Sequence, residues 1–111
     1  MEGLEYTFTD TIKIWQGSKS TWHYVSLPKP MSEEVHTLCQ YHQTKRRGWG
    51  AVRVSAQIGA YTWQTSIFPA FENHQYHLFL KADIRKRAKI AVGDEISVCL
   101  QLIFGVAEQS D

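Results

Sequence analysis

The sequence predicts a small, mainly β domain that closes into a six-stranded barrel, and three observations indicate this fold. Six short segments alternate apolar and polar residues, which is the pattern of strands with one buried face. These segments follow one another at regular spacing, and some carry apolar side chains on both faces. Strands of this kind favour a closed barrel over an open sheet, because closure removes the exposed edges of the sheet.

The composition is that of one folded domain. The chain has 111 residues, close to the commonest domain size, so we expect a single domain over 1–111. Hydrophobic residues make up 43% of it, which excludes a disordered chain. The net charge is +1, so nothing draws the whole molecule toward nucleic acid or a membrane, and any electrostatic binding needs a local patch.

Neither a membrane segment nor a disulfide framework is expected. No stretch approaches 18 apolar residues, and the first residues lack the basic and apolar regions of a signal peptide. The two cysteines, Cys39 and Cys99, lie far apart and have no metal-ligand spacing. Two free thiols suit a reducing compartment, so we expect a cytoplasmic protein without a membrane partner.

The alternating segments place the expected strands. They occupy residues 4–15, 21–27, 49–58, 61–68, 75–80 and 95–103. In the first of them Asp10 interrupts the apolar face, so a bend or bulge is expected there. Gly59 and Ala60 form a tight connection, which makes segments 49–58 and 61–68 a hairpin.

Two helices are expected between the strands. The first covers about 32–43, with Ser32 as its N-cap and with Glu33 and Glu34 in its first turn. Its apolar face is formed by Val35, Leu38, Cys39 and His42. The second is short, about 83–89, and Asp83 can cap it.

Several runs in the chain resemble one known family. They are Arg47–Val54, Trp63–Pro69, Tyr76–Lys81, Ile84–Lys86 and Gly93–Ile96. In these runs and their order the chain resembles the DUF1905 family, over about residues 5 to 102. The resemblance implies a small β-barrel with one helix packed against it. It implies no activity.

A basic cluster is the most distinctive group of charges. It consists of Lys81, Arg85, Lys86, Arg87 and Lys89, with Asp83 among them. Such a cluster can hold a phosphate or carboxylate, or it can be the solvated face of a helix. The family resemblance favours Arg85, since an arginine recurs at that place in the family pattern.

Four tryptophans, Trp15, Trp22, Trp49 and Trp63, are candidates for the walls of a ligand pocket or for barrel packing. We expect Trp22 and Trp63 to be the pocket residues, together with Ser66 from the run that contains Trp63. The predicted ligand-binding residues are therefore Trp22, Trp63, Ser66, Lys81 and Arg85.

Metal binding, catalysis and nucleic-acid binding are judged by whether the chain contains the motifs that each of them requires. The five histidines lack metal-ligand spacing, and the chain has neither a nucleophile elbow nor a glycine-rich phosphate loop. We therefore expect no catalytic residue, metal or cofactor. The basic stretch at 45–47 and the basic cluster at 81–89, with the rings of Trp49 and Tyr61, are compatible with weak binding of single-stranded nucleic acid, although the net charge argues against this partner.

The function that follows is a non-catalytic binding module. Its expected partners are a small anionic ligand, another protein, or further copies of the chain in a homo-oligomer. The alternatives are a weak single-stranded nucleic-acid binder and an uncharacterised enzyme.

Overall fold

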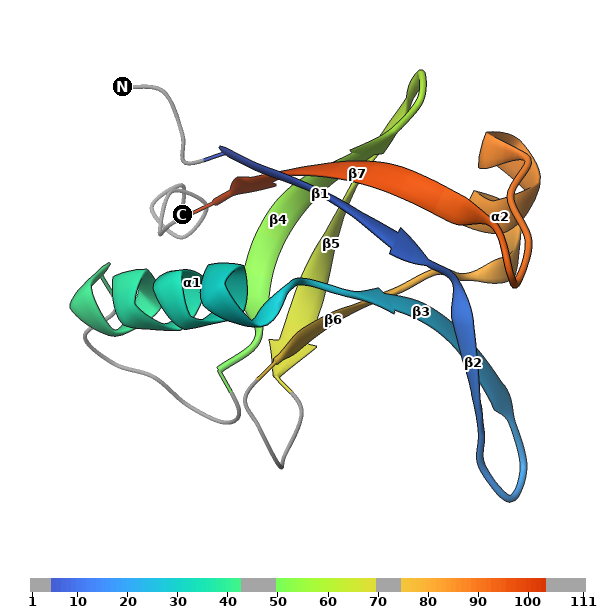
Figure 1. Cartoon of the computed structure of the whole chain (residues 1–111), viewed down its shortest axis with the longest axis horizontal. Helices are drawn as coiled ribbons and strands as arrows, with labels where there is room; N and C mark the ends of the chain where they lie inside the picture. Colours follow the sequence, from blue (N-terminus) through green and yellow to red (C-terminus); the bar gives the residue numbers. More distant parts are fainter. Residues whose placement is uncertain (1–4, 43–49, 70–74, 104–111) are drawn as a thin grey trace, which may run out of the picture.

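The computed structural model describes residues 5–42, 50–69 and 75–103, which form a mainly β fold with two helices (Figure 1). The elements, in chain order, are β1 (Glu5–Thr11), β2 (Lys13–Gln16), β3 (Thr21–Ser26), α1 (Lys29–His42), β4 (Val52–Ile58), β5 (Tyr61–Pro69), β6 (Tyr76–Phe79), α2 (Ala82–Ala88) and β7 (Glu95–Leu102).

The strands form one curved sheet in the order β1-β7-β4-β5-β6-β3-β2, and every neighbouring pair is antiparallel. The sheet curls into a half-barrel and remains open (Figure 1). The predicted mainly β class is confirmed. The prediction of a closed barrel with six strands is wrong, since the sheet is open and has seven strands in the described residues.

The seventh strand arises because the first predicted strand bends at Ile12. Before the bend the chain pairs with β7, and after it the chain pairs with β3. Ile12 is only 1% exposed. Its N–H donates to the carbonyl of Asp94 at 2.9 Å, and its carbonyl accepts from the N–H of Gly93 at 3.0 Å. One segment therefore supplies both edges of the sheet, and the expected interruption at Asp10 lies two residues before the bend.

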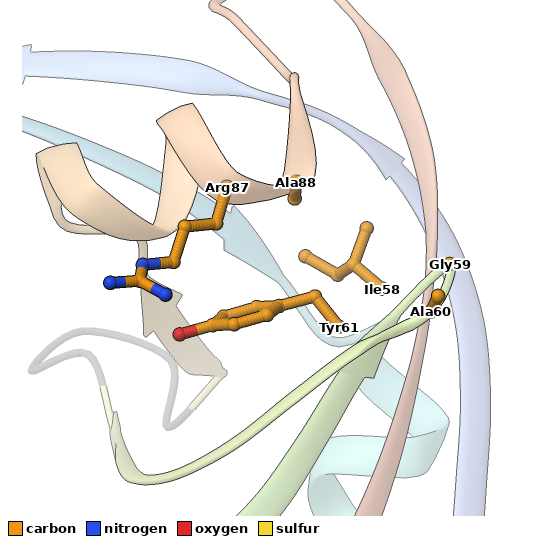
Figure 2. A pocket seen from close by; sticks show the side chains of 6 residues that line it. All are labelled: Ile58, Gly59, Ala60, Tyr61, Arg87 and Ala88. Atoms are coloured by element: carbon orange, nitrogen blue, oxygen red, sulfur yellow. The ribbon is translucent and has the colours of Figure 1, made fainter.

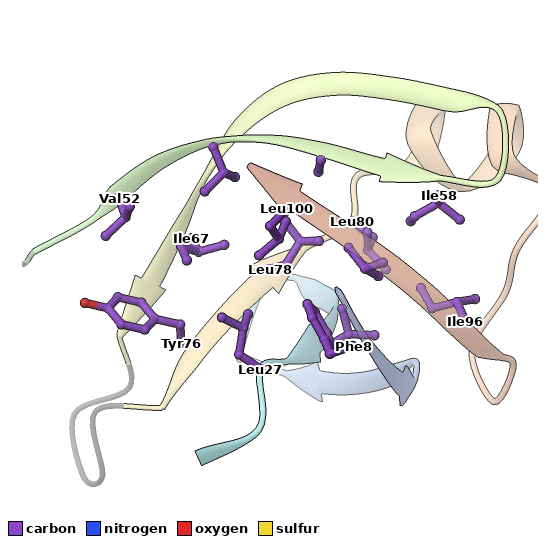
Figure 3. Packing of buried hydrophobic residues seen from close by; sticks show 14 of the residues in the cluster. Phe8, Leu27, Val52, Ile58, Ile67, Tyr76, Leu78, Leu80, Ile96 and Leu100 are labelled. Carbon is purple, nitrogen blue, oxygen red and sulfur yellow. The ribbon is translucent and has the colours of Figure 1, made fainter. Parts of the chain in front are cut away.

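The core lies on the concave side of the sheet (Figure 3). Alternation along each strand sends every second side chain there, so β4 buries Val52, Val54, Ala56 and Ile58. The other strands add Phe8, Ile67, Tyr76, Leu78, Ile96 and Leu100, and Leu27 and Leu80 follow directly after β3 and β6; each of these residues is at most 7% exposed. A fully buried side chain of this kind contributes about 1.5–3 kcal/mol, so this shared core stabilises the fold.

The expected hairpin of β4 and β5 is confirmed. Ile58 lies opposite Tyr61 in the ladder, so Gly59 and Ala60 are the two turn residues. Gly59 has a φ of +59°, and Ala60 does not have a positive φ. Positive φ at the first turn residue alone is the pattern of a type II′ turn, in which glycine is preferred.

Helix α1 begins at Lys29, three residues before the expected start. Ser32 lies inside the helix and is 2% exposed. Its hydroxyl donates to the carbonyl of Leu27 at 3.4 Å and accepts from the N–H of Tyr76 at 3.0 Å. The prediction of Ser32 as N-cap is wrong because this hydroxyl joins α1 to the start of β6. Glu33 and Glu34 consequently lie beyond the first turn.

Helix α2 begins at Ala82, and its N-cap is Lys81, so Asp83 is inside the helix and does not cap it. The helix ends in a Schellman motif. Lys89 adopts a left-handed conformation with φ +60°. Its N–H donates to the carbonyl of Lys86, and the N–H of Ile90 donates to the carbonyl of Arg85. Ile84 is the buried residue of this helix.

The two helices lie at different ends of the half-barrel (Figure 1). Helix α1 lies where β3 ends and β6 begins, and α2 lies beside the turn between β4 and β5.

None of the helices in the described ranges is long and apolar enough to cross a membrane.

Candidate functional site

A shallow pocket lies between α2 and the β4–β5 turn (Figure 2). Its volume is about 290 Å³, and it is lined by Ile58, Gly59, Ala60, Tyr61, Arg87 and Ala88. Ligand pockets typically begin at roughly 300 Å³, so this one suits a small molecule. Its walls are largely apolar, and the guanidinium of Arg87 is its charged group.

The phase of α2 places Arg87 at the pocket. Ile84 points into the core, and residues three and four positions later share the same helix face. Those residues are Arg87 and Ala88, and both line the pocket. The guanidinium carbon of Arg87 lies 6.0 Å from the ring centroid of Tyr61, as a cation–π pair (Figure 2). This contact holds a permanent positive charge at the pocket.

Trp63 supports the pocket from behind. Tyr61 and Trp63 are alternate residues of β5 and so face the same side of the sheet. Their rings are stacked, with centroids 5.5 Å apart and an interplanar angle of 23°. Trp63 lies opposite the small side chain of Ala56 in the ladder. The indole therefore positions the ring of Tyr61 and does not itself line the pocket.

Helix α2 also carries two of the predicted ligand residues. Lys81 is exposed at the N-cap position. Arg85 is half-buried, and its Nη1 donates to the carbonyl of Leu80 at 3.4 Å. Burial and, after it, the charge of Arg85 lower the pKa of His23. Arg85 therefore lies on the side of α2 toward β3, and its neighbour Arg87 lies at the pocket.

The other two predicted residues lie on the outer side of the sheet. Trp22 on β3 is 46% exposed, and its ring is 5.6 Å from that of Phe79. Ser66 on β5 has its hydroxyl 3.5 Å from Nη1 of Arg53. The structure therefore does not bring the five predicted residues into one cleft. The predicted helix-face residues Cys39 and His42 have side chains outside the described part, as do Lys45, Arg46, Arg47 and Trp49.

An aromatic surface covers part of the convex side. It is formed by the outward-facing rings of β2, β3, β5 and β6, and we call it the aromatic face. Its members are Trp15, Trp22, Tyr24, Phe68, His77 and Phe79. Phe79 is central, with its ring 5.6 Å from Trp22, 6.0 Å from Tyr24 and 6.1 Å from Phe68. The 21–27 strand is one of the segments with apolar side chains on both faces, and the structure leaves Trp22 on its outer face half exposed.

A serine and a histidine meet within this face. The hydroxyl of Ser26 is 2.8 Å from Nδ1 of His77, and the two residues are direct neighbours across β3 and β6. Burial, followed by the charge of Lys13, lowers the pKa of His77, while Asp10 acts in the opposite direction. The backbone N–H of Ser26 is itself bound by Asp10. This cross-strand pair holds β3 to β6.

Cys99 has the environment of an inert thiol. Its Sγ donates to a carboxylate oxygen of Glu5 at 3.1 Å. This hydrogen bond and burial raise the pKa of Cys99, which disfavours the reactive thiolate. Across residues 5–42, 50–69 and 75–103, no three His, Cys, Asp or Glu side chains gather as a metal site would require.

These features define a class of protein: a small β half-barrel with a cationic and aromatic pocket at one end. The chain belongs to the family described as "Domain of unknown function (DUF1905)", whose model matches residues 8–100. The match runs from β1 into β7, and it confirms the family resemblance found in the sequence. A search of curated proteins gives no match to this chain.

Proposed function

We propose that this protein is a non-catalytic binding domain whose pocket takes a small organic anion with a flat apolar body. The observation that carries the proposal is the position of Arg87, 6.0 Å over the ring of Tyr61 at the pocket. The free thiol of Cys99 also agrees with a cytoplasmic site of action for such a domain.

The chemistry of the lining favours an anion. Arginine stays charged at all physiological pH values, and its planar fork binds a carboxylate or phosphate through two parallel hydrogen bonds. Arg87 is exposed, so its guanidinium is accessible to a ligand. Lys86 on the same helix and Lys89 directly after the helix are also exposed, and they add positive potential.

The walls favour a flat, apolar ligand body. Ile58, Ala60 and Ala88 line the pocket with aliphatic groups, and Tyr61 contributes a ring. Because Trp63 stacks behind Tyr61, the ring of Tyr61 has a defined position and forms a fixed apolar wall beside the guanidinium of Arg87. At about 290 Å³ the pocket has room for a single-ring acid and not for a nucleotide.

The test is binding of benzoate and phenyl phosphate, followed by NMR chemical shifts of the backbone. We expect shifts at residues 58–61 and 87–88 that saturate with ligand. Arg87→Ala should weaken binding by about tenfold or more, since a charge-assisted hydrogen bond contributes roughly 1.5–3 kcal/mol. The neutral analogue benzyl alcohol should bind the wild type no better than it binds the variant.

The matched control is Lys86→Ala, which removes the same charge from the neighbouring residue but does not touch the pocket. It should weaken binding less than threefold. Equal affinity of Arg87→Ala and the wild type for benzoate would refute the proposal, and so would an absence of shifts around Tyr61.

A further inference from the structure

The aromatic face forms a continuous row across four neighbouring strands. Trp15 on β2 lies opposite Trp22 on β3, the ring of Trp22 contacts Phe79 on β6, and Phe79 contacts Phe68 on β5. Trp15, Trp22 and Phe68 are 56%, 46% and 44% exposed, respectively. The row therefore presents three accessible rings that are not packed in the core.

The area of this row is small for a protein interface. A large aromatic side chain buries about 150–250 Å², so three half-exposed rings present on the order of 300 Å². A stable protein interface buries about 800 Å² on each partner. The exposed rings match instead the faces of a few nucleobases, each of which stacks on a single ring.

On the convex side of the sheet, negative and positive side chains lie on different strands. The outward positions of β1 and β7 include Glu5 and Glu95 and no cation. The outward positions of β2 to β6 include Lys13 and Arg53 and no carboxylate, and Lys19 lies in the β2–β3 turn. On the convex side of the described strands, the cations therefore lie on the half of the sheet that carries the aromatic face, and the carboxylates lie on the other half.

Two of these cations flank the row of rings. Lys13 is bound to Asp10 at 2.6 Å, so its charge is largely neutralised. Lys19 is exposed beyond Trp15, at the β2 end of the row. Arg53 is exposed on β4, directly opposite Ser66 and diagonal to Phe68, at the other end of the row. A chain of stacked bases across the rings would therefore have a cation near its phosphates at each end.

We propose that the aromatic face binds single-stranded nucleic acid. Bases stack on Trp15, Trp22 and Phe68, and Lys19 and Arg53 neutralise two phosphates. Stacking on aromatic platforms combined with cations along the backbone is the general mode of binding without sequence preference. The face is on the opposite side of the sheet from Tyr61 and Trp63, so this binding is independent of the anion pocket.

The test uses fluorescently labelled oligothymidylate and oligouridylate of about 12 nucleotides, in the range that one such domain covers. Fluorescence polarisation should show binding that strengthens as salt falls. Two neutralised phosphates predict a slope of about −1.4 for log K against log salt. The pair of substitutions Lys19→Ala and Arg53→Ala should bring this slope close to zero. The two oligonucleotides distinguish DNA from RNA as the source, and binding of either supports the proposal.

Single substitutions locate the binding surface. Trp22→Ala should weaken binding about tenfold, and Phe68→Ala should do the same from the other end of the row. Gln101→Ala removes an exposed outward side chain on β7, outside the aromatic face, and should have no effect. Thermal melts followed by circular dichroism check that each variant folds. We expect them to fold, because the substituted side chains are at least partly exposed.

Two outcomes would overturn the proposal. One is binding that is unchanged by Trp22→Ala and Phe68→Ala, or lost instead in Arg87→Ala, which would place the oligonucleotide elsewhere. The other is the absence of oligonucleotide binding. A dimer that Trp22→Ala dissociates in sedimentation velocity would in that case identify the face as a self-association surface. Neither outcome affects the benzoate titration, so the two proposals fail separately.

Discussion

The carboxylate of Asp10 accepts a hydrogen bond of 2.8 Å from the backbone N–H of Ser26, which is 16 residues away. The bond joins β1 to β3, two strands that are not paired in the sheet. Lys13 donates to the same carboxylate oxygen at 2.6 Å. A single side chain thus connects the two sides of the opening in the half-barrel, next to the bend at Ile12.

Removal of this carboxylate should destabilise the protein and change its response to acid. Burial raises the pKa of Asp10, but hydrogen bonds from Lys13 and from the N–H groups of Ser26 and Thr11 outweigh it, so the pKa lies below its ordinary 3.8. The stabilisation is therefore complete above pH 3.8 and is lost as the pH falls through the lower folded value. Asp10→Ala should cost roughly 1–3 kcal/mol at neutral pH, because the N–H of Ser26 loses its partner.

Urea unfolding measured at neutral pH and at several pH values below 3.8 tests this prediction. The difference between Asp10→Ala and the wild type should shrink as the pH falls. Glu95→Ala, which removes an exposed carboxylate, is the control and should not reproduce the effect. A difference that stays constant across the pH series would count against the ionised carboxylate as the source of the stabilisation.

Ser32→Ala should destabilise the fold although serine is a poor helix former. The substitution removes the acceptor of the N–H of Tyr76 at a position that is 2% exposed. We expect a loss of roughly 1–3 kcal/mol in the free energy of unfolding. Ser97→Ala is the matched control, since its exposed hydroxyl makes only a 3.4 Å contact with Thr9, and it should stay within about 0.5 kcal/mol. Similar losses in both variants would show that Ser32 has no special role.

Lys89→Gly should stabilise the protein. Lys89 holds the left-handed conformation that ends α2, with φ +60°. This conformation costs a residue with a side chain about 1–2 kcal/mol, and glycine recovers most of it at an entropic cost of roughly 0.5–1 kcal/mol. We expect a net gain of roughly 0.5–1 kcal/mol by thermal or urea unfolding. The control is Lys86→Gly, inside the same helix, which should lower the free energy of unfolding by about 1 kcal/mol. If Lys89→Gly and Lys86→Gly changed the stability in the same direction, the explanation would be contradicted.

The strands could be predicted from the sequence because their pattern is local. Alternation from Val52 to Ile58 identified both faces of β4, and Gly59 identified the hairpin turn. The division of the first strand could not be predicted in this way. It depends on a change of partner at Ile12, from β7 to β3, and both partners lie far along the chain. The interruption at Asp10 was the only local sign of it.

The start of α1 was missed because two local signals compete. Ser32 followed by acidic residues resembles an N-cap, whereas Pro30 suits the first turn of a helix that begins earlier. The structure follows the proline, and the serine hydroxyl bonds to β6 instead. Only the tertiary contact with Tyr76 decides between the two signals.

The residues that line the pocket could not be selected from the sequence. The basic cluster that contains Arg87 was recognised, but Arg85 was favoured within it, and none of the five predicted ligand-binding residues lines the pocket. The spacing held a usable signal, because Ile84 is the apolar residue of α2 and Arg87 is three residues later on the same face. Tyr61 lacked a signal of this kind, since its role depends on how α2 docks beside the hairpin.

The bent segment that supplies both edges of the sheet also predicts an order of folding. Thr9 on β1 lies beside Ser97 on β7, and the two are 88 residues apart in the chain. At a synthesis rate of about 5–20 residues per second, β1 waits on the order of 5–20 s on the ribosome before its partner exists. The β2–β3 hairpin, whose strands are joined by a short turn, can form during that interval. We therefore expect β1 to be among the last strands to join the sheet, because its ladder with β7 connects residues far apart in the chain.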